Sequence, residues 1–571
     1  MFIRVKSSPN SPRRSVQVVE SVRSGNRVSQ VIVRHVGIAL DEAEEVKLRA
    51  MAEEFINRVT LERVNDSALF ATQTIKRKPG RQPRQTLASV APVSEVVLAD
   101  LVEVQRLIEG PHEVLGHLFD YLGFDRIVKG RGTALLRDLV IARIMAPSSK
   151  RQSAEDLDFQ YGRTHSLDSL YRLMDSVHER LDALKEIVFE ATRSLIGGHV
   201  SVMLFDVTTL YFESVATDSL RAFGYSKDQK YHCTQVVLAL ATNEDGLPIG
   251  YELFAGNTAE VSTLLACLSQ WQKKLNIDKV SFVADRAMAS QANLSALEAA
   301  NWPYVIAMPL RRMGQQEQNN ILQMQTATPV SVDCDLLWLR EFAWKGRRVI
   351  LTYSSRRAHK DRRDRQAIID RLKAKLGKGS KKVIDTHTGE ITSTPPKANA
   401  KKLISNSGYL RYIERADEGG AFVLDEDKIA ADAAWDGLHA VVTNDKQTPA
   451  AELLGRYRRL WLIEESFRCL KYSLAVRPIY HFKPERIAAH IGICYLAFAL
   501  ARHAQQRITL AQEAMSIERI RATLHSVQAS VLQHKRTHAK YRMPSAFSHD
   551  ASRIYRAFNL TRNLDAAIDP R

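Results

Sequence analysis

The sequence lacks a cysteine pattern that would hold a zinc ion or a disulfide framework. Five cysteines are scattered over 571 residues, and none forms a CxxC pair or a Cys/His pair at zinc spacing. This argues against zinc-ribbon folds and small secreted folds. Free buried thiols in a reducing, cytoplasmic compartment are expected instead. The cysteines are Cys233, Cys267, Cys334, Cys469 and Cys494.

Long hydrophobic runs are also missing. The first residues, MFIRVKSSPNSPRR, contain no apolar stretch of signal-peptide length. The most apolar run, Ile491 to Ala501, falls short of the ~20 residues that span a bilayer, and Arg502 follows it. We therefore predict a buried core helix here and no membrane partner.

Acidic residues are in short supply relative to basic ones. The chain has 81 Lys plus Arg against 64 Asp plus Glu, a net charge of +17. Such an excess favours a polyanionic partner, because neutralised phosphates release counterions and thereby drive binding. The alternative is a soluble basic protein that has no nucleic-acid partner.

The length predicts several domains, at roughly 100–200 residues each. Alternation around Ser24-Gly25-Asn26 predicts a β-hairpin over 15–37, followed by a helix over 41–59 and a basic linker at 74–86. Helical patterns dominate 100–198 and the C-terminal ~90 residues. The expected domains are an N-terminal region at 1–95, a helical DNA-binding domain at 96–198, a catalytic core at 199–309 plus 446–480, an insertion at 310–445 and a C-terminal helical region at 481–571.

From residue 199 the pattern changes to buried strands. Three strands come first, and two more follow, each preceded by an amphipathic helix. The order β-β-β-α-β-α-β fits an antiparallel meander continued by parallel crossovers, which is the ribonuclease-H-like arrangement. The fold class is therefore multidomain α/β: a ribonuclease-H-like catalytic core with a β-rich insertion, flanked by helical DNA-binding regions. The insertion includes a hairpin around Lys345-Gly346 and a very basic helix that carries Arg362 and Arg363.

Two aspartates follow runs of buried-strand residues. Asp206 ends the strand HVSVMLFDV, and Asp285 ends KVSFVADRA. Catalytic groups in open α/β sheets commonly lie outside the strand ends, so the two carboxylates meet if their strands are neighbours. A turn or helix-cap role for either residue is the alternative.

A third carboxylate can be chosen from helix geometry. A single helix is expected over 448–472, with one apolar stripe; Glu464 lies about 60° from the centre of that stripe and Glu465 turns roughly 100° further, towards solvent. Tyr457, Arg468 and Lys471 share the rim with Glu464. A phenol and two cations beside a carboxylate suit a metal ion and an adjacent phosphate. An ordinary amphipathic helix with a charged flank is the alternative. The stripe consists of Leu453, Leu460, Ile463, Phe467, Leu470 and Leu474.

Four segments together resemble DDE transposases from bacterial insertion sequences. They are FDVTTLYFES, GLPIGYELFAGNTAE, VADRAMAS and YRRLWLIEESFRCLK. The resemblance is to the cut-and-paste group that has a Tyr-Arg-Glu-Lys signature on its glutamate helix. The N-terminal hairpin, the PSSK segment at 147–150 and the basic insertion also resemble that group.

The resemblance implies roles for individual residues. Asp206, Asp285 and Glu464 match the catalytic metal-binding triad, and Tyr457 and Lys471 match residues that contact DNA phosphates. Leu460 stands where the signature has arginine, and Ala287 stands where glycine is common. The residues that can replace the missing arginine are Arg458, Arg459 and Arg468. Trp435 is interpreted as a core residue, with base stacking as the alternative.

The resemblance also implies a reaction and its partners. Two Mg²⁺ ions, or Mn²⁺ in their place, would support cleavage at element ends and joining to target DNA. The partner is double-stranded DNA, both terminal repeats and target, bound by a homodimer in a nucleoid-associated bacterial setting. The route, hairpin or otherwise, stays open. A ribonuclease-H-like nuclease without strand transfer and an inactive DNA-binding descendant are the alternatives.

Overall fold

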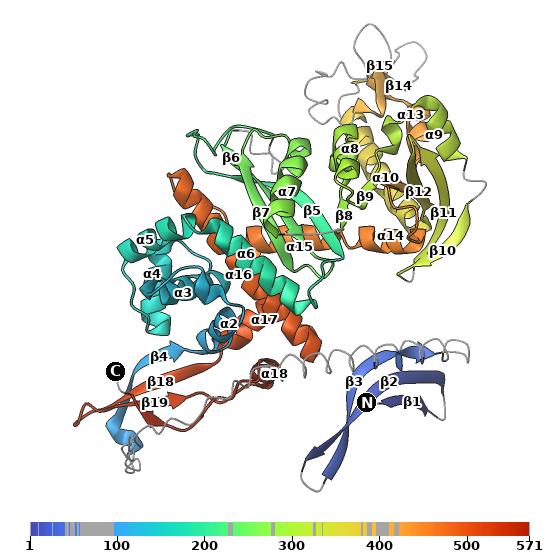
Figure 1. The fold of residues 1–571 in the computed structure, drawn as a ribbon. Helices are drawn as coiled ribbons and strands as arrows, with labels where there is room; N and C mark the ends of the chain where they lie inside the picture. The colour runs from blue at the N-terminus through green and yellow to red at the C-terminus, as the bar shows by residue number, and fades with distance from the viewer. Residues whose placement is uncertain are drawn as a thin grey trace. The chain divides into compact units, whose positions relative to one another are not determined.

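Figure 1 shows the computed structural model of the chain. It describes residues 2–39 without 9–10 and 25–26, then 45, 49, 52–53 and 56, and 96–569 without 226–231, 276–279, 324–326, 334, 378–380, 385–390, 395–409 and 416–421. The predicted linker at 74–86, most of the predicted helix at 41–59, and Cys334 lie outside these residues. The chain divides into two compact units, Met1–Ala99 and Asp100–Arg571.

The smaller unit is an antiparallel sheet in the order β1-β2-β3. Its strands are β1 (Phe2–Ser8), β2 (Ser11–Ser24) and β3 (Arg27–Ala39). Val16 and Val18 of β2 alternate towards Ala52, and Ile3 and Val5 pack against them. The register pairs Ser24 with Arg27, which confirms the predicted hairpin.

The larger unit is built on a nine-stranded mixed sheet (Figure 1). Part of it has the order β7-β6-β5-β8-β9, in which β5, β6 and β7 are antiparallel and β8 and β9 run parallel to β5. The predicted succession of strands and helices is confirmed. The elements are β5 (Val202–Tyr211), β6 (Gln235–Thr242), β7 (Pro248–Ala255), α7 (Glu260–Leu275), β8 (Ser281–Ala284), α8 (Gln291–Ala299) and β9 (Tyr304–Ala307).

The same sheet continues through residues that were expected to form a separate insertion. Beyond β9 its order is β17, β12, β11 and β10. Lys345 and Gly346 both have positive φ and join β11 to β12, which confirms the predicted hairpin. The strands are β10 (Thr328–Val332), β11 (Asp335–Trp344), β12 (Arg347–Tyr353) and β17 (Leu438–Thr443). Segment 310–445 is thus hydrogen-bonded to the core sheet.

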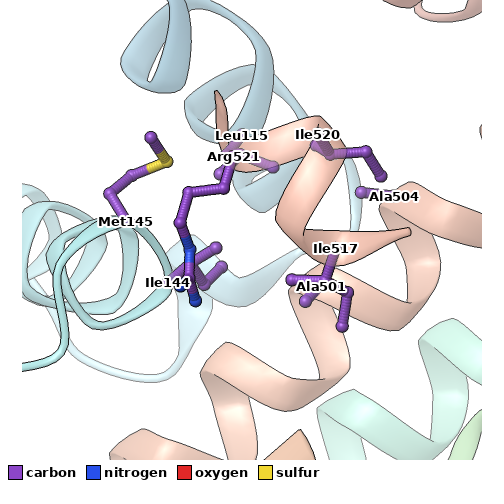
Figure 2. Close-up of a pocket in the computed structure, with 8 residues that line it drawn as sticks. All are labelled: Leu115, Ile144, Met145, Ala501, Ala504, Ile517, Ile520 and Arg521. Atoms are coloured by element: carbon purple, nitrogen blue, oxygen red, sulfur yellow. The ribbon is translucent and has the colours of Figure 1, made fainter. Parts of the chain in front are cut away.

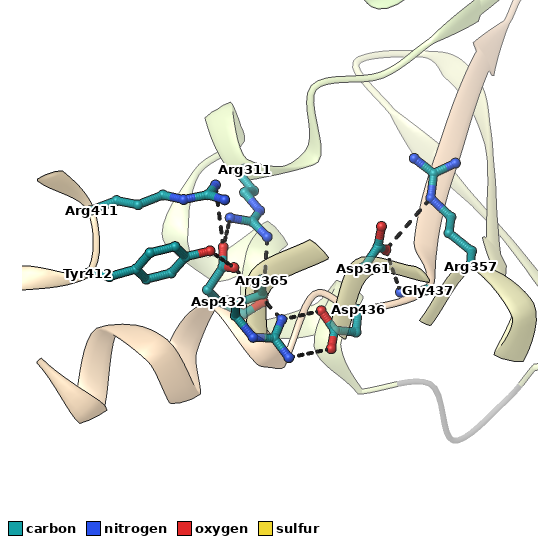
Figure 3. A network of polar contacts seen from close by, with 9 residues as sticks. All are labelled: Arg311, Arg357, Asp361, Arg365, Arg411, Tyr412, Asp432, Asp436 and Gly437. Carbon is teal, nitrogen blue, oxygen red and sulfur yellow. Dashed lines mark hydrogen bonds and ion pairs between the residues drawn. The ribbon is translucent and has the colours of Figure 1, made fainter. Parts of the chain in front are cut away.

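Ion pairs hold the remaining insertion elements together (Figure 3). Arg365 of α10 is buried and donates to both carboxylate oxygens of Asp436, the longer bond being 2.7 Å. Asp432 of α13 accepts from Tyr412 at 2.6 Å and pairs with Arg311. The elements are η4 (Leu310–Arg312), α9 (Gln315–Leu322), α10 (Ser355–Gly377), β13 (Lys381–Ile384), β14 (Ile391–Thr394), β15 (Ile413–Arg415), β16 (Phe422–Leu424) and α13 (Glu426–Ala433).

Helices cover both faces of the sheet, and β5 shows which face is which. Val202, Leu204 and Leu210 belong to one apolar cluster, together with residues of α15 (Trp461–Arg468) and α16 (Pro484–Ala511). Met203, Phe205 and Val207 belong to a second cluster, together with α7 and α8. Successive strand residues point to opposite faces, so even-numbered β5 residues face α15.

The helix predicted from the run at 491–501 is α16 (Pro484–Ala511). Among the described residues it alone is long and apolar enough to cross a membrane, but 94% of its apolar window is buried inside the fold. The prediction of a core helix is confirmed. It contacts α2, α3, α5 and α6, which belong to the region 100–198.

The regions predicted as helical also contain strands, and in this respect the prediction was wrong. β4 (Leu101–Ile108) pairs with β18 (Gln528–His534), and the sheet order is β20-β19-β18-β4. Five of the eight residues of β4 are exposed, so this strand lacks the regular alternation of buried and exposed residues that marks a half-buried strand. The other elements are η1 (Leu98–Asp100), α2 (Gly110–Tyr121), η2 (Phe124–Arg126), α3 (Arg131–Met145), α4 (Lys150–Tyr161), α5 (Leu167–His178), α6 (Leu181–Leu195), α17 (Ile517–His525), β19 (Lys540–Pro544), α18 (His549–Ala557) and β20 (Ala567–Ile568).

Candidate active site

Strand register brings Asp206 and Asp285 to neighbouring positions. In the parallel pair β5–β8, Phe205 lies opposite Ala284. Asp206 and Asp285 are the next residues on the two strands. Neighbouring strands are about 4.8 Å apart, so these two backbones lie side by side. Asp285 is exposed, and its Oδ1 accepts the Arg286 backbone N–H at 2.6 Å.

Asp206 does not end its strand, contrary to the prediction. β5 continues to Tyr211, and Asp206 pairs with Leu240 of β6. The parallel partner β8 ends at Ala284, so beyond Phe205 the strand β5 is paired only with β6. Asp206 therefore lies directly after Phe205, the last β5 residue that pairs with the parallel strand β8. As an even-numbered residue of β5 it faces α15.

The helix that carries the third carboxylate is broken, and the expectation of one helix over 448–472 was wrong. The observed elements are α14 (Ala450–Arg458), α15 (Trp461–Arg468) and the π-helical turn η5 (Cys469–Ser473). Arg459 and Leu460 donate to carbonyls three residues back, a tighter 3₁₀-type turn. The angular offset between Tyr457 and Glu464 therefore differs from the single-helix value. All six predicted stripe residues are nevertheless buried.

Glu464 is exposed on α15, and α15 contacts β5 and β6. The neighbouring Glu465 was predicted to face solvent, and this was wrong. Glu465 lies 3.2 Å from Arg502 of α16 and is two-thirds shielded from water. Glu464 is thus the glutamate available to the sheet edge, and Glu465 fastens α15 to the core.

Tyr457 lies within electrostatic range of both Asp285 and Glu464. Burial raises the pKa of its phenol, and these two carboxylates raise that pKa further. Its ring lies 5.0 Å from the ring of His439 in β17. Burial lowers the pKa of His439 to about 3, and the cations Arg357 and Arg286 add to that effect. Tyr457 is thus influenced by two carboxylates, Asp285 and Glu464, and by two guanidinium groups, Arg286 and Arg357, and it lies beside a neutral imidazole.

Three of these neighbours were missed from sequence: Arg286, Arg357 and His439. Arg286 had an available signal, because it directly follows Asp285. Arg357 at the start of α10 and His439 in β17 are far away in sequence from Asp285. The strand order β12-β17-β9-β8 brings them into the same sheet region, with β17 separated from β8 only by β9. No local pattern reports such a placement.

The donor chemistry of the three carboxylates fits a hard divalent cation, which prefers oxygen ligands. Two of them occupy neighbouring register positions at β5 and β8, and the third lies on α15, which packs on β5 and β6. Within the described ranges, however, no three His, Cys, Asp or Glu side chains are close enough together to hold one ion. Asp206 and Asp285 therefore share one edge of the sheet, and Glu464 lies on a helix that contacts the strand of Asp206, without a closed three-residue metal cluster among the described residues.

The part of the chain that contains these elements matches a known protein family. The model of the transposase DDE domain family matches residues 199–500, which is more than half of the chain. The chain belongs to this family. The resemblance to DDE transposases is thereby confirmed, while the insertion-sequence group and the Tyr-Arg-Glu-Lys signature remain predictions.

Two solved transposase structures are similar to this DDE transposase chain, and no curated protein matches it. The first is a piggyBac transposase synaptic complex with hairpin DNA, at 10% identity, TM-score 0.34, 73% of this chain and 77% of that one. The second is a Mos1 transposase paired-end complex with the left transposon end, at 16% identity, TM-score 0.14, 30% of this chain and 57% of that one.

The arginines proposed to replace the one missing at Leu460 differ in their contacts. In the transposase core, Arg458 donates to the Val332 carbonyl and to Asp335, and Arg459 pairs with Glu244 at 2.7 Å. Arg468 is exposed, and within the described residues it has no hydrogen-bond or ion-pair partner. Of the three, only the Arg468 side chain has no hydrogen-bond or ion-pair partner among the described residues.

The other predicted DNA contacts lie in two places. Lys471 is half-buried in η5. Arg362 and Arg363 are exposed on α10, where Arg363 lies 3.8 Å from Asp364. Trp435 is partly buried against the second apolar cluster, with the Arg311 guanidinium 5.7 Å from its ring. Its interpretation as a core residue is consistent with this packing.

The C-terminal end of the glutamate helix is held by α17. Arg521 donates to the Ser473 carbonyl at 2.7 Å, and Ser473 donates to Glu518 at 2.9 Å. The Arg521 stem reaches across a small cavity (Figure 2), otherwise lined by apolar side chains from α2, α3, α16 and α17. Burial lowers the pKa of Arg521. Both the backbone carbonyl and the side-chain hydroxyl of Ser473 in η5 are therefore hydrogen-bonded to α17.

A basic groove of about 530 Å³ lies between the start of α3 and α5. Its charged lining consists of four cations, Lys129, Arg131, Arg172 and Arg180, and one acid, Glu179. Gly130 and Gly132 flank Arg131, so the backbone at the start of α3 carries little side-chain cover. Arg172 already pairs with Asp168 at 2.6 Å. The remaining cations make this transposase groove a candidate surface for DNA phosphates.

Proposed function

We propose that the chain cleaves the ends of a mobile DNA element and joins them to target DNA by metal-dependent phosphoryl transfer. The carrying observation is the register of β5 and β8, which sets Asp206 beside Asp285 on the face covered by the Glu464 helix. The strand order β7-β6-β5-β8-β9 also supports a ribonuclease-H-like core, since three antiparallel strands are followed by two parallel ones.

The residues of the chain divide the work. Asp206, Asp285 and Glu464 would hold one or two Mg²⁺ or Mn²⁺ ions, which supply an activated water and stabilise charge on the scissile phosphate. Arg286 and Arg357 lie around the same edge and would neutralise neighbouring phosphates. Tyr457, protonated because burial raises its pKa, would donate a hydrogen bond to a phosphate oxygen.

Double-stranded DNA is the partner that this arrangement requires. The net charge of +17, the groove between α3 and α5, and the exposed cations of α10 all favour a long polyanion. Phosphate contacts from these surfaces would set the position of the duplex, whereas the carboxylate edge would cut it. Joining two element ends to one target would require two active sites, so we propose a homodimer in the DNA complex.

The test is to incubate the chain with Mg²⁺ and DNA carrying the repeats that flank its own gene. Mapping the products at single-nucleotide resolution should show metal-dependent cuts at the repeat ends and joining of the freed 3′-hydroxyl to target DNA. Cuts without joined products would mean a nuclease that lacks strand transfer. The absence of any metal-dependent product would refute the proposal.

A further inference from the structure

A buried lysine lies in the first turn of α4, at the end of the PSSK segment at 147–150. Ser149 is the N-cap of this helix and accepts the Gln152 backbone N–H at 3.2 Å, so Lys150 is the first helical residue. Lys150 is only 4% exposed, and among the described residues it has no carboxylate within ion-pairing distance. Both a helix N-terminus and an apolar interior disfavour a positive charge. A lysine in this place therefore points to a role beyond stability.

The partner of this lysine is a histidine of α16. Lys150 Nζ lies 3.3 Å from His490 Nδ1, and His490 Nε2 lies 2.9 Å from the Val476 carbonyl oxygen. Burial lowers the pKa of His490 well below its usual range, so the ring is neutral and carries a single N–H. The carbonyl oxygen requires this N–H on Nε2. Nδ1 is then an acceptor, and Lys150 is its donor.

A second tautomer of His490 has a partner within reach. Cys494 Sγ lies 3.7 Å from His490 Nε2. With the proton on Nδ1 instead, Nε2 would accept from this thiol, and the Val476 carbonyl would lose its donor. A group that donates to Nδ1 disfavours that tautomer, because two N–H groups would then face each other. Lys150 thereby favours the form of His490 that binds the Val476 carbonyl.

Val476 closes the turn that follows the glutamate helix. Its backbone N–H donates to the Leu470 carbonyl at 2.9 Å, and η5, which contains Leu470, follows α15 directly. Arg143 of α3 donates to the neighbouring Ala475 carbonyl at 3.4 Å. The last carbonyls of a helix have no backbone partner within it. Side chains of α3, α16 and α17 therefore supply the donors at this end of the glutamate helix.

The helix α16 holds the glutamate helix at two points. Arg502 pairs with Glu465, the neighbour of Glu464, and His490 binds the carbonyl of Val476. The two contacts are about 18 Å apart along α16. Two contacts along a helix fix its direction, and one does not. The direction of α15, and with it the place of Glu464, therefore depends in part on the His490 contact.

We propose that Lys150 and His490 are positioning residues for Glu464. Lys150 holds the His490 ring, the ring binds the Val476 carbonyl, and this carbonyl fixes the end of the helix that carries the glutamate. The inference rests on the proposed function, because it assigns a support to a carboxylate that is proposed to bind metal. It also gives the PSSK segment a role, since Ser149 begins the helix that carries Lys150.

Two substitutions of Lys150 separate its hydrogen bond from its charge. Lys150→Gln keeps an N–H donor for His490 and removes the charge, whereas Lys150→Met removes both at similar side-chain length. Hydrogen–deuterium exchange of the peptide 461–476 should rise about ten-fold or more in the Met variant and stay near wild type in the Gln variant. The Mg²⁺ concentration that gives half-maximal cleavage should rise several-fold in the Met variant alone. DNA affinity in EDTA should be the same in all three proteins.

Lys185→Met is the matched control, because Lys185 of α6 is also shielded, with 15% of its side chain exposed, but pairs with Glu252 of β7. It should lower the thermal midpoint and leave both the exchange of 461–476 and the Mg²⁺ requirement unchanged. Wild-type exchange of this peptide in Lys150→Met would overturn the inference. A Gln variant as impaired as the Met variant would also overturn it, since the hydrogen bond to Nδ1 would then have no effect. The exchange measurement involves no cleavage, so failure of the proposed function is recognised separately, by the absence of cleavage in the wild type.

Discussion

Glu465 is ion-paired to Arg502 at 3.2 Å, whereas Glu464, one residue earlier, is exposed on the other side of the same helix. Adjacent residues on α15 thus have separate roles. Glu464 is free to reach the edge formed by Asp206 and Asp285. Glu465 compensates the charge of Arg502, whose side chain is only 9% exposed.

The two glutamates should therefore respond differently to the same substitution. Glu464→Gln should abolish DNA cleavage and leave the thermal midpoint and DNA affinity near wild type, because it removes a metal-ligand charge. Glu465→Gln should keep cleavage and lower stability by about 1–3 kcal/mol, because Arg502 loses its anionic partner in a nearly buried setting. Cleavage assays and thermal unfolding of both variants check this. Loss of cleavage in Glu465→Gln alone would reverse the assignment.

Asp206→Asn and Asp285→Asn should each abolish cleavage while duplex binding persists, because binding depends on basic surface rather than on these carboxylates. Isothermal titration with Mn²⁺ on the folded variants should show weakened metal binding. Asp245→Asn, in the turn between β6 and β7, is a control that also removes one carboxylate. Normal metal-dependent cleavage by either Asp206→Asn or Asp285→Asn would remove that residue from the site.

Arg458 and Arg468 should separate stability from DNA binding. Arg468→Ala should weaken binding of the cleaved end several-fold without lowering the thermal midpoint, since Arg468 is exposed. Arg458→Ala should lower the midpoint instead, because the Val332 carbonyl and Asp335 lose their donor. Restoring the missing signature residue by Leu460→Arg is not a useful rescue, because Leu460 is only 8% exposed and a charge there would be buried. Unchanged DNA binding by Arg468→Ala would show that Arg468 does not replace the arginine missing at Leu460.

The exposed cations of α10 should affect the salt dependence of duplex binding. Replacing Lys360, Arg362 and Arg363 with alanine should reduce the log–log salt slope by up to about 0.9 for each lost phosphate contact. Arg365 is excluded from the set, because its ion pair with Asp436 is structural. The same experiment with Lys129, Arg131 and Arg180 tests the groove between α3 and α5. If alanine replacement of one of these two groups of cations leaves the log–log salt slope unchanged, that group does not contact DNA.

Lys150 should make stability depend on pH between 7 and 10.5. Burial, and to a smaller extent the charge of Arg143, lowers its pKa to about 7. His490, His481 and Cys494 also face this group, and Lys150 Nζ lies 3.3 Å from His490 Nδ1. In that window the unfolded lysine is protonated and the folded one is neutral, so the unfolded state binds more protons. Unfolding free energy contributed by this group therefore rises with pH, by up to about 1.4 kcal/mol per unit.

Urea unfolding of wild type and Lys150→Met at several pH values isolates this contribution. The difference in stability, wild type minus variant, should increase from pH 7 to pH 10. A difference that stays constant would mean that Lys150 is charged in the folded protein. Groups elsewhere cancel in the comparison, because both proteins carry them.

The order of elements in the core was predictable because each is encoded locally. Buried runs such as 202–205 and the 3.6-residue pattern of α7 depend only on near neighbours. The same runs predicted two aspartates at a shared edge, since strand ends collect catalytic groups. The helix stripe of Leu453 to Leu474 was also correct, because burial follows the apolar side chains even where the helix is broken.

Other features depend on residues far apart in the chain. The turn at Arg459–Leu460 has neither proline nor glycine. The helices on its two sides contact different strands, α14 contacting β9 and α15 contacting β5. The role of Glu465 depends on Arg502. The pKa of His439 is lowered first by its burial in the fold and then by the charges of Arg357 and Arg286. Pairing of β4 with β18 joins the two ends of the larger unit, and no local pattern could predict it.

That pairing also concerns how the chain is made. β4 emerges from the ribosome some 420 residues before β18, the partner against which it pairs. At about 5–20 residues per second, synthesis leaves its edge unpaired for roughly 20–80 s. A chain that stops after Glu464 would contain all three carboxylates proposed to act in DNA cleavage but could not form the β4–β18 ladder. Folding of the larger unit is thereby coupled to translation of its last part, and prematurely ended products would be left with an open strand edge.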